Sequence, residues 1–194
     1  MIKPEVKTVL YPEVRHLIEV GDFIGCRGGK LISRLIRMFR GGVMNMSHAA
    51  IIVESSKSPS ERVKVFEALG GPGMVRTLLT DAYEHDHGEI FWAPMKNNEL
   101  EQDLILDEIE RIELEDIKYD YGVTFLAIFK RITLDIARFN CSELFWHLQR
   151  YCGRVAAVWN KKKKKEVAPC PGNCIVKGWA NCPIVYRLIF AHRK

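Results

Sequence analysis

Residues 139–146, FNCSELFW, have the composition of a helix start that carries a thiol in its first turn. Asn140 is a preferred N-cap residue, and Glu143 stands three positions later, as in a capping box. Cys141 therefore falls where the helix dipole favours a thiolate and where backbone N–H groups can donate to an oxyanion. Cys141 also fits a small buried apolar position on the core side of the helix. The local sequence leaves both interpretations open.

A cysteine nucleophile needs a base, and the chain has six histidines. His48 lies in the strand-like run SHAAIIVE at 47–54, on the side of the strand that carries apolar residues. Glu67 lies in a second such run, VKVFEAL at 63–69, again among apolar residues of the same alternation. Buried imidazole and carboxylate groups each need a polar partner, so we expect the two to pair if their strands are adjacent. A purely structural core histidine is the alternative.

The elements that must position these side chains follow from the residue periodicity. Runs of β-branched and aromatic residues between turns predict strands, and apolar residues at helical spacing predict helices. Strands are predicted at 21–26, 47–54, 63–69, 73–79, 89–95 and 184–190, and helices at 30–40, 99–120 and 141–152. The short polar linker at 55–62 makes the strands on either side of it antiparallel neighbours.

Five short motifs, taken in chain order, resemble the circularly permuted branch of the NlpC/P60 papain-like superfamily. They are Gly21-Asp22, SHAAIIVE, FEALG followed by GMV, YDYG at 119–122, and FNCSELFW. The resemblance covers about residues 20–155 and extends to YiiX/YaeF-type proteins and, more distantly, to the lecithin:retinol acyltransferase group. It implies an α+β, permuted papain-like fold. In that fold an antiparallel sheet or partly open barrel packs against helices, and the nucleophile lies at a helix N-terminus.

The resemblance also implies roles for single residues. Cys141 matches the nucleophile, His48 the general base and Glu67 the residue that orients the imidazole. Tyr119 matches a tyrosine that helps to stabilise the oxyanion, with Tyr121 as the alternative. The implied activity is that of a cysteine peptidase, amidase or lipid acyl hydrolase that needs no cofactor. Its substrate is a peptide, an amide or a lipid ester. The alternatives are an acyltransferase of the lecithin:retinol acyltransferase type, and a non-catalytic protein of the same fold that binds nucleic acid or membrane.

The net charge of +5 conceals three charged blocks. Five positive charges form the lysine run 161–165, and ten acids lie within 99–120. The helix at 30–40 collects its basic residues on one side, which is typical of a helix at a lipid interface. Its basic residues placed to face a ligand are Lys30, Arg34 and Arg37. We expect an anionic ligand or a membrane surface there, and no nucleic acid. A packed helix with a solvated basic side is the alternative.

The composition limits the class of protein that this chain can form and the compartment in which we expect it. With 194 residues, of which 47% are hydrophobic, the chain is expected to form one domain at 1–194. Its core is predicted at about 20–155, followed by a loop-rich extension at 156–194. Charged residues interrupt the first twenty positions, and no apolar stretch approaches the roughly 18 residues of a membrane span. We therefore expect a cytoplasmic protein with reduced thiols, with membrane contact only at its periphery.

His85, Asp86 and His87 could bind a metal, but they lie in an acidic loop that is typical of polar surface, so the stronger candidate zinc ligands belong to the C-terminal part of the chain. They are Cys170, Cys174, Cys182 and His192. Their spacing departs from the paired geometry of zinc knuckles, and prolines beside them indicate plain turns. We therefore predict no metal site, with zinc binding by these cysteines as the alternative.

Overall fold

The computed structural model of the chain describes residues 3–40, 42–56, 58, 61–69, 72–81, 88–115, 117–119, 138–154, 159–160, 165–166, 174 and 183–190. The helices are α1 (Tyr11–Val14), α2 (Leu31–Arg40), α4 (Glu99–Leu114) and α6 (Cys141–Tyr151), with a 3-10 turn at Arg15–Leu17. The strands up to α4 are β1 (Glu5–Leu10), β2 (Phe23–Arg27), β3 (His48–Glu54), β4 (Lys64–Leu69), β5 (Gly73–Leu78) and β6 (Glu89–Ala93). The strands after α4 are β7 (Lys118–Tyr119), β8 (Arg138–Phe139), β9 (Trp159–Asn160), β10 (Lys165–Glu166) and β11 (Ile184–Ile189).

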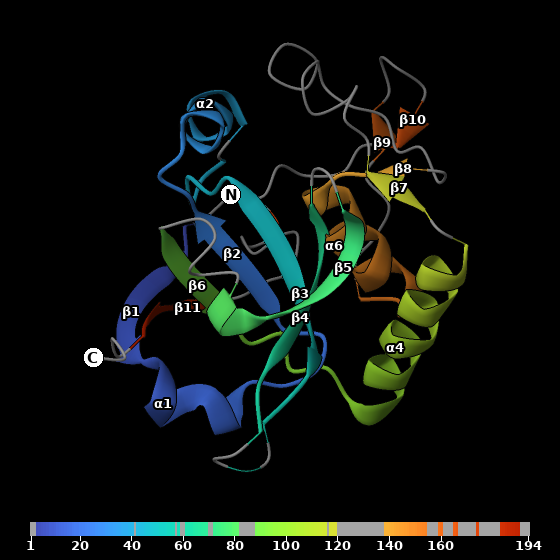
Figure 1. Cartoon of the computed structure of the whole chain (residues 1–194), viewed down its shortest axis with the longest axis horizontal. Coiled ribbons are helices and arrows are strands. Elements are labelled where there is room, and N and C mark those ends of the chain that lie inside the picture. Colours follow the sequence, from blue (N-terminus) through green and yellow to red (C-terminus); the bar gives the residue numbers. More distant parts are fainter. Residues whose placement is uncertain are drawn as a thin grey trace.

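Seven of the described strands form one sheet in the order β1-β11-β6-β2-β3-β4-β5 (Figure 1). β3 and β4 are antiparallel neighbours, as their short linker predicts. The sheet is mixed rather than wholly antiparallel, because β1 from the start of the chain runs parallel to β11 from its end. Both of these strands lie outside the expected core at about 20–155, so the sheet extends beyond it. The α+β class, with an open sheet packed against helices, is confirmed.

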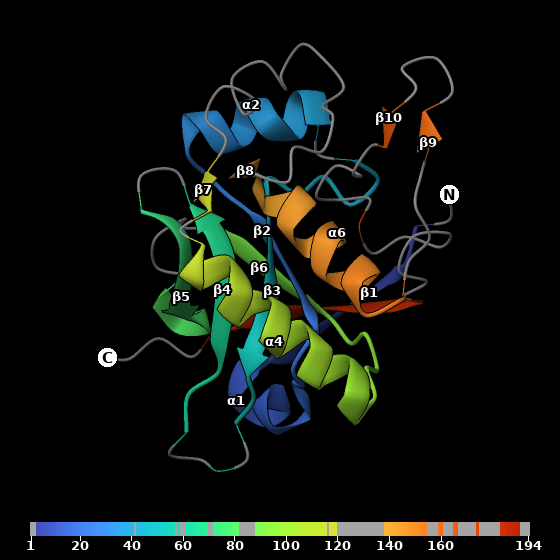
Figure 2. The same cartoon turned by 90° about the vertical axis from the view of Figure 1, so that its right-hand side faces the viewer.

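The two faces of the sheet belong to two different apolar cores, because side chains alternate along each strand. The first core joins the sheet to α4 and α6, which lie together over one face (Figure 2), and contains Phe23, Ile51, Phe66, Phe91 and Phe145. The second core fills the opposite face around α1 and contains Tyr11, Ile18, Ile24, Ile52, Val65 and Trp92. Burying each such side chain is worth roughly 1.5–3 kcal/mol, so both cores hold the strand register.

Helix α4 is shorter than the helix predicted at 99–120. It begins at a capping box, in which Asn98 Oδ1 accepts from the Glu101 N–H at 2.9 Å and Glu101 Oε2 accepts from the Asn98 N–H at 2.8 Å. Its apolar side is buried at Ile105, Ile109 and Ile112. The helix ends at Leu114, where the Glu115 N–H caps it by donating to the Arg111 carbonyl, and the chain continues to β7, which pairs with β8.

Helix α2 occupies one end of the molecule, above the sheet in both views (Figures 1 and 2). Its bounds, Leu31–Arg40, agree with the basic helix predicted at 30–40. Among the described helices, none is both long enough and apolar enough to cross a lipid bilayer.

Candidate active site

Helix α6 begins at Cys141 because Asn140 caps it. Asn140 Oδ1 accepts from the backbone N–H groups of Ser142 and Glu143, each at 3.1 Å, and Glu143 Oε2 accepts from the Asn140 N–H at 3.0 Å. The capping box predicted for this segment is therefore present. Cys141 follows as the first helical residue, with only 8% of its surface exposed.

The cap leaves one backbone donor of the first turn beside the thiol. The N–H groups of Ser142 and Glu143 are bound by the Asn140 side chain, and the N–H of Leu144 by the Asn140 carbonyl. The Cys141 N–H has no acceptor among the described residues. A backbone N–H at a helix N-terminus is suited to stabilise an oxyanion that forms on a group bound to the adjacent sulfur.

His48, the first residue of β3, lies diagonally across from Glu67 of β4. The strand register pairs Ala50 with Glu67, so the two polar side chains share one face of the sheet. His48 Nε2 lies 2.8 Å from Glu67 Oε2, and the two side chains are 19% and 4% exposed. The contact expected from the alternation of the two strands is therefore present.

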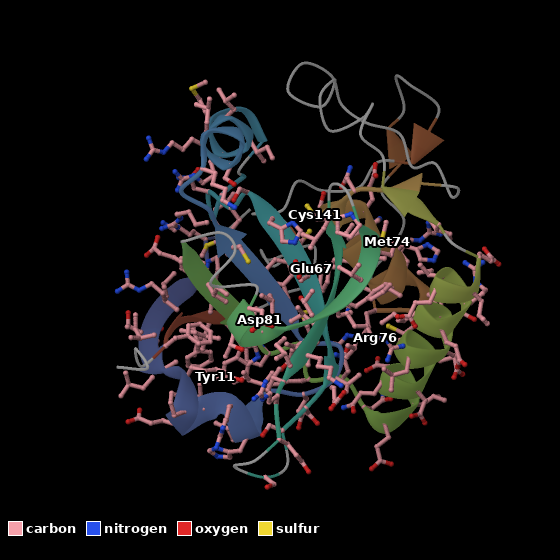
Figure 3. The ribbon with its side chains drawn as sticks, in the orientation of Figure 1. Tyr11, Glu67, Met74, Arg76, Asp81 and Cys141 are labelled. Carbon is pink, nitrogen blue, oxygen red and sulfur yellow. The ribbon has the colours of Figure 1, made fainter. Side chains whose placement is uncertain are left out.

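Cys141 is the second partner of His48. Its side chain lies close enough to the imidazole for its charge and hydrogen bonding to raise the pKa of His48, and Figure 3 shows Cys141 beside Glu67 in that view. Because Nε2 faces Glu67, Nδ1 is the ring nitrogen left for the sulfur. Burial lowers the pKa of His48, but the charges and hydrogen bonds of Cys141 and Glu67 outweigh burial and raise that pKa well above its ordinary value of 6.5. The shift favours the protonated form of the imidazole.

Thr77 is a further member of this cluster, and no motif in the sequence singles it out. Its hydroxyl on β5 donates to Glu67 Oε1, the carboxylate oxygen that does not face His48. The register pairs Thr77 with Val65, so Thr77 is the diagonal neighbour of Glu67 on the next strand. The only indication of Thr77 in the sequence is its place in the predicted strand 73–79. That its partner is Glu67 follows only from the register of β4 with β5.

The Gly21-Asp22 turn ties α6 to the sheet. Gly21 has a φ of +86°, and a Cβ at this position would overlap the Asn97 side chain, so glycine is required. Its carbonyl accepts from Gln149 Nε2 of α6 at 3.1 Å. Asp22 is buried and accepts from Trp92 Nε1 at 2.8 Å. Burial raises the pKa of Asp22 to about 6. The N–H groups that donate hydrogen bonds to its carboxylate lower the pKa, but by less than burial raises it.

A second pair of carboxylate and imidazole joins α4 to α6. Glu108 is buried, and its Oε1 lies 2.6 Å from His147 Nε2. Arg111 donates to both oxygens of the same carboxylate, at 2.6 and 2.8 Å. Burial acts to raise the pKa of Glu108, but Arg111 and His147 outweigh it and hold that pKa below its ordinary value. This pair therefore holds α6, the helix that carries Cys141, against α4.

Tyr119 and Tyr121 were the two candidates for an oxyanion donor. The backbone of Tyr119 pairs with Phe139 of β8, two residues before Cys141, so the chain passes close to the start of α6. The side chain of Tyr119 and the whole of Tyr121 lie outside the described residues. Both roles remain predictions.

The basic residues predicted to face a ligand all belong to α2 or its start. Lys30 and Arg34 are exposed, and Arg37 is half-buried. Both views show this helix at the end of the molecule where α6 begins (Figures 1 and 2).

The candidate zinc ligands are only partly described. Cys174 lies buried in the core beneath α4 and α6, whereas Cys170, Cys182 and His192 lie outside the described residues. Within the part of the chain that the structure describes, no group of three or more His, Cys, Asp or Glu side chains is arranged to hold a metal ion.

The chain is similar in fold to a solved structure, the metalloprotein YiiX from Escherichia coli O157:H7, DUF1105. The two chains are 15% identical, the match covers 89% of this chain and 97% of the other, and the TM-score is 0.61. The likeness to a YiiX-type protein agrees with the resemblance found in the sequence, and at this identity it shows the fold alone. No protein-family model matches the chain, and no curated protein matches it in sequence.

Proposed function

We propose that the protein is a cysteine-dependent hydrolase of amide or ester bonds, with Cys141 as nucleophile, His48 as general base and Glu67 as the residue that orients the base. The observation that carries the proposal is the position of His48, whose Nε2 lies 2.8 Å from Glu67 Oε2 and whose pKa is raised by the charge and hydrogen bonding of Cys141. Its raised pKa favours an imidazolium beside the sulfur, which is the state in which a thiolate is stabilised.

In the first half-reaction, the Cys141 thiolate attacks the substrate carbonyl carbon while His48 Nδ1 holds the proton. Formation of the S–C bond moves the carbonyl electron pair onto oxygen, and the Cys141 N–H donates to this oxyanion. When the intermediate collapses, the bond to the amine or alcohol breaks. That group leaves with the proton from His48, and the acyl group stays on Cys141 as a thioester.

In the second half-reaction, neutral His48 takes a proton from a water molecule whose oxygen attacks the thioester carbonyl. The new intermediate collapses, the carboxylic acid leaves, and the thiolate and imidazolium are restored. Glu67 stays ionised and accepts the Nε2–H of His48, which keeps Nδ1 directed at the sulfur.

Two observations support a permuted papain-like arrangement for this chemistry. His48 and Glu67 lie on strands that precede the helix of Cys141 in the chain, which is the reverse of the usual papain-like order. The YiiX-type fold agrees with the family that the motifs resemble. That neighbour is a metalloprotein, whereas the described residues of this chain include no group of side chains arranged to hold a metal ion, and no proposed step uses one.

Alkylation by iodoacetamide at about pH 6 tests the proposal, because an ordinary thiol with a pKa of about 8.5 is almost unreactive there. We expect rapid labelling of Cys141, an acyl thioester on it detectable by mass spectrometry, and loss of ester and amide hydrolysis in Cys141→Ala. Cys152→Ala is the matched control, since burial raises the pKa of the Cys152 thiol. Adding a primary alcohol separates hydrolysis from acyl transfer, because a transferase yields the new ester.

Slow labelling of Cys141 together with unchanged hydrolysis in Cys141→Ala would exclude the proposed mechanism.

A further inference from the structure

Helix α2 exposes a line of large apolar side chains. Leu31 and Met38 are 73% and 67% exposed, and their spacing of two helical turns puts them on the same side of the helix. Leu35 lies between them on that side and is half-buried. Single exposed leucines are common on protein surfaces, whereas a line of apolar residues along one helix is typical of a contact surface.

Positive charge flanks this apolar line. Lys30 and Arg34 are both exposed, and each precedes a member of the line by one position. No aspartate or glutamate occurs in the sequence between Asp22 and Glu54. Apolar side chains bordered by cations are the pattern of a helix that lies in the headgroup region of an anionic bilayer.

Helix α4 shows that exposed leucines alone do not make such a surface. Leu100 and Leu114 of α4 are 67% and 81% exposed, as much as the apolar residues of α2. Their neighbours include Glu99, Glu101 and Glu113, which an anionic surface repels. The distinguishing property of α2 is therefore the combination of exposed apolar residues with the positive charges of Lys30 and Arg34, with which no described aspartate or glutamate forms an ion pair.

The position of α2 relates this surface to the candidate active site. Figures 1 and 2 show α2 at the end of the molecule where α6 begins, and Figure 3 shows Cys141 toward this same end. A surface that α2 contacts therefore lies on the side of the protein that carries the thiol.

We infer that α2 docks the protein on an anionic lipid bilayer, so that Cys141 acts on amide or ester bonds of amphiphiles held in that surface. The docking rests on α2 alone, and the substrate class rests on the proposed function. Leu31 and Met38 enter the boundary between headgroups and acyl chains, while Lys30 and Arg34 contact headgroup phosphates. A nucleic acid would match the charges but leave both apolar side chains in water, which favours lipid as the partner.

Cosedimentation of the full-length Cys141→Ala protein with vesicles tests docking without turnover. We expect binding to vesicles of phosphatidylcholine with phosphatidylserine, much weaker binding to phosphatidylcholine alone, and weakening by salt. Lys30→Gln with Arg34→Gln lowers the partition coefficient about 30-fold. Leu31→Ser with Met38→Ser lowers it about 100-fold. The matched control, Leu100→Ser with Leu114→Ser, leaves it unchanged, and thermal unfolding verifies that each variant is folded.

Docking is overturned if the folded protein binds neither kind of vesicle, if the α4 control loses binding equally, or if duplex nucleic acid is bound instead of vesicles. The substrate class is tested separately with the wild-type protein, which we expect to cleave an ester lipid faster in anionic than in neutral vesicles. If Cys141 cleaves soluble esters but shows no such preference, the substrate class is wrong while the proposed function stands. If Cys141 is inert toward every substrate while vesicle binding persists, the proposed function fails and the docking stands.

Discussion

His48 Nε2 and Glu67 Oε2 lie 2.8 Å apart on adjacent strands, and the other oxygen of Glu67 accepts from the Thr77 hydroxyl on the next strand. Three neighbouring strands thus orient one imidazole. The thiol comes from a different layer, because Cys141 begins the helix α6 that packs on the sheet. The chemistry of the site therefore depends on both the register of the strands and the position of α6 on the sheet.

Replacement of Glu67 by glutamine tests the role of its charge. Glu67→Gln keeps the size of the side chain but removes one of the two groups that raise the pKa of His48. We expect kcat/KM to fall about 100-fold, which is within the usual contribution of general acid–base catalysis. The alkaline limb of the pH profile should move to lower pH. A profile that does not move would show that the carboxylate does not act through His48.

Thr77 is expected to act as a positioning residue for Glu67. Thr77→Val keeps the shape of the side chain but removes the donor to Glu67 Oε1, and we expect kcat to fall about tenfold with KM unchanged. Thr77→Ser retains a hydroxyl and should restore most of the rate. Equal loss in both variants would point to packing instead of the hydrogen bond.

The charge on His48 predicts a pH dependence of stability. The folded state holds the imidazole proton more tightly than the unfolded state, whose pKa is near 6.5. This stabilisation is fully present below the unfolded pKa and is lost as the pH rises through the raised folded pKa. Urea denaturation between about pH 6 and about pH 9 should therefore show a falling free energy of unfolding. The same series on His48→Gln should show a smaller fall, and an equal fall would assign the effect to other groups.

Removal of Glu108 should destabilise the protein, because its buried carboxylate joins α4 to α6. We expect Glu108→Ala to lower the free energy of unfolding by about 2 kcal/mol at neutral pH, as for lost hydrogen bonds to a charged group. Since the pKa of Glu108 is lowered on folding, its contribution is present above the unfolded pKa and lost as the pH falls through the folded one.

The matched control for Glu108 is Glu113→Ala. Glu113 pairs with Arg76 where both side chains are partly exposed, and such pairs contribute about 0.2–1 kcal/mol to stability. Urea denaturation of the two variants gives the comparison. Similar losses would mean that burial of Glu108 does not set its contribution.

Features that depend on residues close in the chain were predictable. The capping box of Asn140 and Glu143 needs partners only three positions apart, so the start of α6 and the place of Cys141 follow from the local sequence. The pairing of β3 with β4 follows from a short linker, and the contact of His48 with Glu67 follows from that pairing and from alternation.

Features that join distant segments were not predictable in this way. The parallel pairing of β1 with β11 joins segments near the two ends of the chain; no strand was predicted at Glu5–Leu10, and the pattern at 184–190 specifies no partner. Helical periodicity gave no reason to single out Glu108 from the other acids of α4, and its contact with His147 exists only because α4 packs on α6. The end of α4 at Leu114 likewise falls short of the helix that periodicity predicted to 120, and β7 follows it.

The sequence by itself determined the local elements and the chemical groups they carry, namely a thiol at a helix start and an imidazole and a carboxylate on adjacent strands. The tertiary structure decided what surrounds those groups: Thr77 against Glu67, the Gly21 carbonyl against α6, and α2 at the end of the molecule toward which Cys141 lies. The physical reason is the distance along the chain over which each interaction acts. Capping and alternation act over a few residues, whereas strand register and helix packing are set by the burial of two whole apolar cores.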